Sequence, residues 1–229
     1  MGPDLMGDMR AQAEKFGAEI VQNYVTSVDL CVPPFVVKTA DATYAAKTVI
    51  VATGASARLL GLPSERALMG HGVSTCATCD GYFFRGHEIA VVGGGDSAME
   101  EAVYLTRFAS KVTLVHRRET LRASKIMQDK ARANPKIEWC LNTEVEEIID
   151  EGKGEVTGMR LRDARTGVTH VVPVSGVFVA IGHTPNTALF KHQIELDAMA
   201  TSSLATVPRP ISPVSLPAAM CKTTSIGRP

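Results

Sequence analysis

The sequence predicts an α/β fold with a parallel sheet, and three observations lead to that fold class. Residues 89–92 form an apolar strand-like run, three glycines follow at 93–95, and residues 96–107 have the apolar spacing of a helix. A second strand-like run follows at 112–115. Strand, glycine turn, helix and strand in this order make a βαβ unit, which implies a parallel sheet and a right-handed crossover. The pattern is that of a Rossmann-like nucleotide-binding domain.

The N-terminal part predicts a helix and several short strands. Residues 4–16 place apolar side chains on one stripe, and Gly17 ends the helix. Strand-like runs follow around 20–21, 25–29 and 35–38, and a compact apolar strand is expected at 47–52, ending in Thr53 and Gly54. Residues 55–75 are rich in loop-forming residues, and we expect them to link two units.

The C-terminal part completes the predicted sheet. A helix is expected at 123–133 and a strand at 137–140. Residues 144–149, 157–162 and 170–174 predict a small antiparallel insertion, and 176–181 returns as the last core strand. From Met199 onward the chain has Pro208, Pro210, Pro213 and Pro217 among small polar residues and no periodicity, so we expect disorder there.

Composition narrows the class of protein. Apolar residues make up 45% and charged residues 21%, as in an ordinary soluble globular protein. Basic and acidic residues number 24 each, which argues against broad binding to nucleic acid or a membrane surface. We expect no membrane span and no signal peptide. Five mostly scattered cysteines do not resemble a secreted disulfide framework, so we expect a reducing compartment, the cytoplasm or an organelle.

The glycine turn has the spacing of a dinucleotide-binding fingerprint. Its first glycine permits the tight turn, its second lets the backbone approach a pyrophosphate, and the small residue at 98 lets helix and strand pack closely. A phosphate would then lie at the helix N-terminus. The candidate cofactor-binding residues here are Gly93, Gly94, Gly95, Asp96, Ser97 and Ala98. The alternative is a plain turn between strand and helix.

Arginines follow the second strand of this unit. An NAD site has an acidic residue about 20 residues past the glycines, for the ribose 2′-hydroxyl. This chain instead has His116, Arg117 and Arg118, with Arg122 one helical turn further on. Guanidinium groups match phosphate geometry, so the cluster predicts NADPH through its 2′-phosphate. The alternative is a solvated basic edge.

A close cysteine pair precedes this domain. Cys76 and Cys79 are separated by two residues, which lets their sulfurs close a small disulfide. Zinc is the competing interpretation, but His71 and His87 lack the spacing of a zinc element, so we expect no metal. Inert packing is the other alternative. Asp80 directly follows Cys79 and is a candidate to shuttle a proton to or from sulfur. The alternative is an aspartate at a helix start that interacts with the helix dipole.

Both candidate sites handle two electrons. A nicotinamide delivers a hydride, and a dithiol/disulfide pair also takes up two electrons. Hydride does not pass efficiently straight to sulfur, so a flavin is expected to mediate.

Several motifs together resemble one family. The sequences CATCDG (76–81), VVGGGDSAMEEA (91–102), HRRETLRASKIM (116–127) and AIGHTPNT (180–187) are similar to those of small, flavin-dependent thioredoxin reductases, in the pyridine nucleotide-disulfide oxidoreductase family. The resemblance implies one FAD domain and one NADPH domain, and a homodimer. It implies that Cys76 and Cys79 take electrons from reduced flavin and pass them to thioredoxin, with Asp80 as proton donor.

The resemblance also assigns cofactor residues. It places Arg117, Arg118 and Arg122 on the 2′-phosphate, and Ile181 and Gly182 at the cofactor. Thr53 and Gly54 match a flavin-proximal stretch. We expect a partial FAD-binding domain over residues 1–62, an NADPH-binding domain with the cysteine pair over 63–187, and a divergent tail over 188–229.

The chain also departs from the family pattern at both ends. Members begin with a strand, a glycine turn and a helix that bind the ADP half of FAD, and they end with a Gly-Asp segment that contacts the flavin. Neither is recognisable here. The prediction is therefore an NADPH-dependent thioredoxin-disulfide reductase, truncated and inactive as this chain. The alternative is a flavin-free NADPH-binding module or a fragment that pairs with a full-length subunit.

Overall fold

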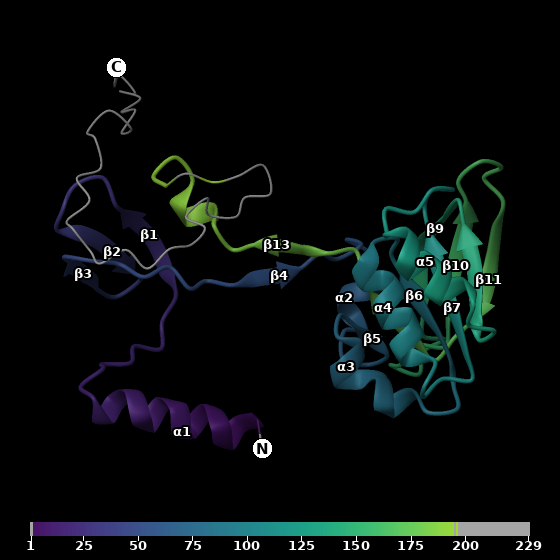
Figure 1. Ribbon diagram of the computed structural model, residues 1–229, viewed down its shortest axis with the longest axis horizontal. Coiled ribbons are helices and arrows are strands. Elements are labelled where there is room, and N and C mark those ends of the chain that lie inside the picture. Colours follow the sequence, from purple (N-terminus) through teal and green to yellow (C-terminus); the bar gives the residue numbers. More distant parts are fainter. Residues whose placement is uncertain (1, 195, 197–229) are drawn as a thin grey trace. The chain divides into compact units, whose positions relative to one another are not determined.

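The computed structural model describes residues 2–194 and 196, and its chain divides into two compact units (Figure 1). Unit 1 comprises Met1–Gly54 with Pro185–Pro229, and unit 2 comprises Ala55–Thr184. These limits differ by a few residues from the domain limits expected at 62 and 187. The tail predicted to be disordered, from Met199 onward, lies outside the described residues.

Unit 2 is built on a five-stranded sheet in the order β5-β12-β6-β7-β8. Every neighbouring pair in it is parallel, which confirms the predicted α/β fold. The strands are β5 (Val73–Ser74), β12 (Gly176–Val179), β6 (Glu88–Val92), β7 (Lys111–His116) and β8 (Ile137–Leu141).

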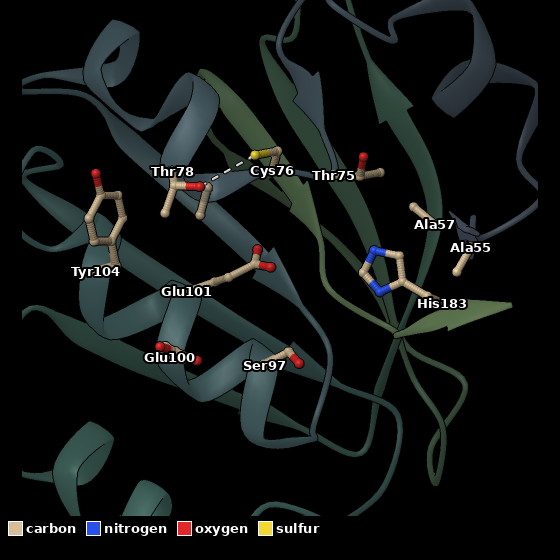
Figure 2. A pocket seen from close by; sticks show the side chains of 11 residues that line it. Ala55, Ala57, Thr75, Cys76, Thr78, Ser97, Glu100, Glu101, Tyr104 and His183 are labelled. Carbon is tan, nitrogen blue, oxygen red and sulfur yellow. Dashed lines mark hydrogen bonds between the residues drawn. The ribbon is translucent and has the colours of Figure 1, made fainter. Parts of the chain in front are cut away.

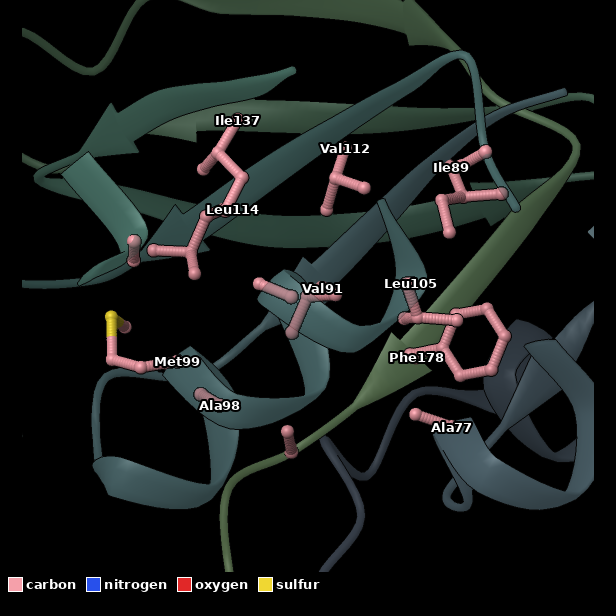
Figure 3. Close-up of a cluster of buried hydrophobic side chains, with 14 of the residues drawn as sticks. Ala77, Ile89, Val91, Ala98, Met99, Leu105, Val112, Leu114, Ile137 and Phe178 are labelled. Atoms are coloured by element: carbon pink, nitrogen blue, oxygen red, sulfur yellow. The ribbon is translucent and has the colours of Figure 1, made fainter. Parts of the chain in front are cut away.

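One face of this sheet is covered by helices α4 (Asp96–Leu105) and α5 (Lys125–Arg132). Ile89 and Val91 alternate with Ala90 and Val92 along β6, so each face of the strand receives an apolar pair. Figure 3 shows the helix side of the core, where side chains of α4 meet those of β6, β7, β8 and β12. The fully buried members of this cluster include Ile89, Val91, Ala98, Met99, Ala102, Leu105, Val112, Leu114 and Phe178.

The other face is covered by an antiparallel sheet in the order β11-β10-β9. Its strands are β9 (Thr143–Ile149), β10 (Gly158–Asp163) and β11 (Thr169–Pro173), which confirms the predicted antiparallel insertion. Ile148, Met159 and Leu161 are buried against the parallel sheet. The parallel sheet is therefore apolar on both faces, as its continuous apolar strands predict.

The stretch at 55–75, expected to be loop-rich, contains short elements. They are β4 (Ala55–Ala57), α2 (Pro63–Ala67) and β5, and β4 pairs with β13 (His183–Pro185). Next come α3 (Ala77–Asp80), which contains Cys79 and begins directly after Cys76, and the 3-10 turn η1 (Gly81–Phe84).

Unit 1 contains α1 (Gly2–Lys15) and an antiparallel sheet of β1 (Val25–Asp29), β2 (Phe35–Thr39) and β3 (Thr43–Ala46). The second stretch of the chain in this unit begins at Pro185 and contains the 3-10 turn η2 (Ala188–Phe190). Gln193 joins this stretch to the sheet, since its Oε1 accepts from Leu30 N at 2.8 Å and its Nε2 donates to Val28 O at 2.9 Å.

Two predictions for unit 1 are wrong. The apolar run at 47–52 forms no strand, and Ile50 is 92% exposed. A strand requires a neighbour to satisfy its backbone groups, and no strand in the described part of the chain pairs with this run. The run at 20–21 likewise belongs to no strand, whereas β3 was not predicted. Among the described helices, none is both long and apolar enough to cross a bilayer.

Candidate functional site

The glycine turn between β6 and α4 is built around close contacts that only glycine permits. A Cβ at Gly93 would lie 2.3 Å from Ala180 O, and a Cβ at Gly94 would lie 2.3 Å from His116 Cε1. Gly93 N also donates to Val115 O at 3.0 Å. Gly95 differs, because a Cβ added there would meet no described atom beyond its chain neighbours within 4 Å. Its missing side chain leaves open space at the helix start.

The arginine loop after β7 is fastened to this turn. Arg122 N and Ala123 N both donate to Gly94 O, at 2.8 and 3.1 Å. From the helix side, Asp96 Oδ1 accepts from Ser124 N at 2.6 Å. Asp96 was predicted to be a cofactor residue, and the structure gives it this structural contact. The loop that carries the arginines is thereby held beside the helix N-terminus.

His116 ends β7 and is 8% exposed beneath Gly94. Its ring Nε2 lies 3.2 Å from Thr120 O, and since a carbonyl can only accept, this nitrogen carries the hydrogen. Burial lowers the pKa of His116, and the positive charges of Arg122, Arg117 and Arg118 lower it further. The ring is therefore neutral at pH 7 and packs under the turn instead of adding a positive charge.

The turn, the arginine loop and the end of β12 enclose a pocket of about 520 Å³, here called the nucleotide pocket. Many of the predicted cofactor residues line it, namely Gly93, Gly94, Gly95, Ser97, His116, Arg117, Arg122, Ile181 and Gly182. Ala98 is buried in the core instead, and Asp96 and Arg118 lie outside the lining. Thr53 and Gly54 belong to unit 1, where their carbonyl oxygens accept from Asn186.

One wall of the nucleotide pocket was not predicted from the sequence. Arg58, Leu59 and Leu60 line it. The carboxylate of Glu65 is fully buried and holds this wall, since it accepts from Leu60 N and Gly61 N, both at 2.8 Å. No sequence signal connects this segment with the glycine turn, because folding alone brings them together.

Cys76 and Cys79 form a disulfide with an S–S distance of 2.00 Å, as the two-residue spacing predicts. Cys76 Sγ accepts from Cys79 N at 3.3 Å and lies 3.5 Å from the Thr78 hydroxyl. Donors aimed at one sulfur favour its thiolate after reduction. Within the described residues, no group of three or more His, Cys, Asp or Glu side chains is arranged to hold a metal ion.

Cys76 lies at the edge of a second pocket of about 600 Å³, here called the disulfide pocket (Figure 2). Ser97 lines this pocket as well as the nucleotide pocket. The other lining residues are Ala55, Ala57, Thr75, Ala77, Thr78, Glu100, Glu101, Tyr104 and His183. One helix, α4, therefore contributes to both pockets.

The carboxyl groups near the disulfide have different surroundings. Asp80, the predicted proton donor, accepts from Ser74 Oγ at 2.6 Å and lies outside the lining of the disulfide pocket. Glu101 lies inside it, and its Oε2 is buried with no hydrogen-bond partner among the described residues. Burial, with a smaller contribution from Glu100, raises the pKa of Glu101 to about 7. No motif in the sequence singles out Glu101.

Comparisons with known proteins agree with this geometry. A family model for pyridine nucleotide-disulphide oxidoreductases matches residues 8–202. The chain is 56% identical to a thioredoxin reductase of Streptomyces clavuligerus over 86% of its own length and 61% of the relative's. It is 57% identical to one from Mycolicibacterium smegmatis, over 86% and 62%.

A solved structure gives the same result. The thioredoxin reductase from Streptococcus pyogenes superimposes with a TM-score of 0.71 at 44% identity, covering 86% of this chain and 64% of that one. The chain thus spans less than two thirds of the length of these relatives. The resemblance predicted from the motifs is confirmed, and the chain belongs to the pyridine nucleotide-disulphide oxidoreductase family.

Proposed function

We propose that this chain binds NADPH in the nucleotide pocket and that its Cys76–Cys79 disulfide carries electrons from NADPH to thioredoxin. The observation that carries the proposal is the shared helix α4. Its first turn faces the glycine turn and the arginines, and its next turn lines the disulfide pocket beside Cys76. A pyridine nucleotide site and a redox-active disulfide are thus built on one element.

The nucleotide pocket fits NADPH by its chemistry. Gly95 leaves room for a pyrophosphate at the start of α4, where free backbone amides and the helix dipole favour negative charge. Arg117 and Arg122 line the same pocket and would hold the 2′-phosphate. Glu144 also lines it, but its carboxylate is paired with Arg162 at 2.8 Å, so its charge is largely compensated. When bound, NADPH supplies a hydride.

The flavin implied by the resemblance does not find a complete site in the described part of unit 1. That part contains one exposed helix, one antiparallel sheet and a 3-10 turn, without a strand–glycine turn–helix unit for a pyrophosphate. Thr53 and Gly54 are exposed and bonded to Asn186. This favours a second candidate function, an NADPH-binding module without flavin or one that pairs with a full-length subunit. Bound flavin, visible as yellow colour, separates the two.

The cysteine pair reduces its partner by thiol–disulfide exchange. The thiolate of Cys79, the more exposed of the two cysteines, attacks one sulfur of the partner disulfide, and a mixed disulfide forms as the other partner sulfur leaves. Cys76 then attacks Cys79 Sγ, which re-forms the bond between them and releases the reduced partner. Two electrons and two protons pass to the partner. Thioredoxin is the partner that we propose, within a homodimeric assembly in the cytoplasm.

Cofactor preference tests the proposed function directly. We expect calorimetry on the purified chain to show NADPH bound at least roughly tenfold more tightly than NADH, since even one charged hydrogen bond contributes about 1.5–3 kcal/mol. NADH serves as the matched control because it lacks only the 2′-phosphate. Equal affinity for the two nucleotides would reject the assignment of the arginines.

The disulfide gives a second prediction. We expect Cys76 and Cys79 to interconvert between disulfide and dithiol under mild reduction and oxidation, because Cys79 is exposed and Cys76 is half-buried. Differential alkylation with peptide mass spectrometry measures this. Cys140, a free and half-buried thiol, is the internal control and should remain a thiol throughout. A Cys76–Cys79 bond that resists reduction would contradict the redox role.

A further inference from the structure

The carboxyl group of Glu101 shares the disulfide pocket with Cys76. Figure 2 shows the Glu101 side chain reaching from α4 into the pocket, with Cys76 and Thr78 along one side and His183 across from it. Among the described residues, its buried Oε2 has no hydrogen-bond partner. A buried oxygen without a partner is costly, and a carboxylate more so than a neutral carboxyl. The structure therefore keeps an acid in the same pocket as Cys76 without fixing it to another protein group.

Asp80 does not occupy that place. Its Oδ2 is engaged by the Ser74 hydroxyl, and Ser74 Oγ in turn accepts from Cys76 N at 3.0 Å. This arrangement fixes the backbone at the start of α3. Of these two carboxyl-bearing residues, Glu101 lines the same pocket as Cys76 and Asp80 does not.

On these grounds we propose that Glu101 exchanges a proton with Cys76 when the Cys76–Cys79 disulfide is reduced and re-formed. The inference rests on the redox role proposed above and adds a proton-transfer residue to it. Cys79 is the more exposed of the two cysteines, so an incoming thiolate attacks its sulfur. The S–S bond breaks, its electron pair moves to Cys76 Sγ, and Glu101 gives that sulfur a proton.

The electrons and protons of this reaction balance when the reductant is a dithiol. Its second thiol displaces Cys79 from the mixed disulfide, and the proton that this thiol loses goes to the Cys79 sulfur. Its first thiol gave up a proton to water when it became the attacking thiolate, and Glu101 regains one from water. The dithiol thus loses two electrons and two protons, and the cysteine pair gains both.

The charged and titratable groups around Glu101 determine how it changes the reactivity of Cys76. Glu100 and Tyr104 face the disulfide pocket from α4, and His183 faces it from β13. The pKa of Glu101 is raised to about 7 by burial, so the carboxyl is neutral below that pH and negative above it. A negative Glu101 repels the Cys76 thiolate. The reactivity of Cys76 should therefore rise with pH in two stages, one for the carboxyl and one for the thiol.

The experiment follows Cys76 in the reduced chain without nucleotide, flavin or partner protein. Reduce the protein with dithiothreitol, remove the reagent, and measure the iodoacetamide alkylation rate of Cys76 between pH 4.5 and 10 by peptide mass spectrometry. Wild type should show the two stages. Glu101→Gln should show a single stage, displaced to lower pH by about one unit from the thiol stage of wild type. This displacement corresponds to a roughly tenfold higher alkylation rate at a fixed pH between the two wild-type stages. Glu100→Gln, the adjacent glutamate on α4, should keep both stages.

A second measurement uses the wild-type chain alone, in case the variant does not fold. The side-chain carboxyl of Glu101 is titrated by carbon NMR in the oxidised and in the reduced protein. The titration midpoint should be higher in the reduced form, where the carboxyl shares a proton with the new thiol. An identical midpoint in both forms, or an unchanged alkylation profile in folded Glu101→Gln, would overturn the proposal. Neither readout depends on NADPH binding, so failure here is distinguishable from failure of the proposed function.

Discussion

Gly93→Ala is expected to lower the free energy of unfolding of unit 2 by about 3 kcal/mol, the upper end of the usual cost of overpacking. The new methyl group would lie 2.3 Å from Ala180 O and 2.7 Å from Ala98 Cβ. Ala180 follows β12 directly, and Ala98 is buried in the first turn of α4. Neither atom belongs to a flexible side chain, so the sheet and the helix must separate. Urea denaturation followed by circular dichroism measures the loss.

Gly95→Ala is the matched control, two residues along the same turn. A Cβ there meets no described atom within 4 Å, and the backbone φ of −98° suits any residue. Its stability should stay within about 1 kcal/mol of wild type. Its affinity for NADPH should nevertheless fall roughly tenfold or more, because the methyl group occupies the approach to the helix start. Equal stability loss in both variants would show that the turn is not packed as described.

The double variant Arg117→Ala/Arg122→Ala should produce the largest loss of NADPH binding. Each lost charged contact costs about 1.5–3 kcal/mol, or roughly 10- to 150-fold in Kd. NADH binding should hardly change, because the 2′-phosphate is the group that the arginines are proposed to hold. Calorimetry with both nucleotides measures the difference.

Two single variants serve as controls for that experiment. Arg118→Ala removes a neighbouring charge that lies outside the lining of the nucleotide pocket, and its effect should stay below tenfold. Arg165→Ala removes an exposed charge in the turn between β10 and β11 and should leave both affinities unchanged. If Arg118→Ala matches the double variant, the loop binds the nucleotide in another arrangement than the one described.

The sequence predicted unit 2 well because the signals there are local. The strand ending at Val92, the glycine turn and the helix from Asp96 follow one another within a short stretch, so periodicity and turn chemistry define them. The run at 47–52 has equally strong strand character, but a strand depends on neighbours supplied from elsewhere in the chain. Local pattern and actual structure therefore agree in one unit and differ in the other.

The same reasoning explains which site residues were predicted. The glycines and arginines belong to a contiguous fingerprint with a known relation to phosphate. Arg58, Glu65 and Glu101 have no such context. Arg58 lines the nucleotide pocket only because β4 pairs with β13. Glu101 is half-buried because α4 packs beside α3, which a sequence pattern does not reveal.

Helix α4 has a thermodynamic consequence for the two sites. Ser97 borders both pockets, and Glu101 follows it by about one turn of the helix. If the binding of a nucleotide changes the ease with which the disulfide is reduced, then reduction of the disulfide must change the affinity for nucleotide by the same factor. The oxidised and reduced forms of this chain then bind the same nucleotide with different affinities. A single comparison of their dissociation constants reports the coupling free energy between the sites.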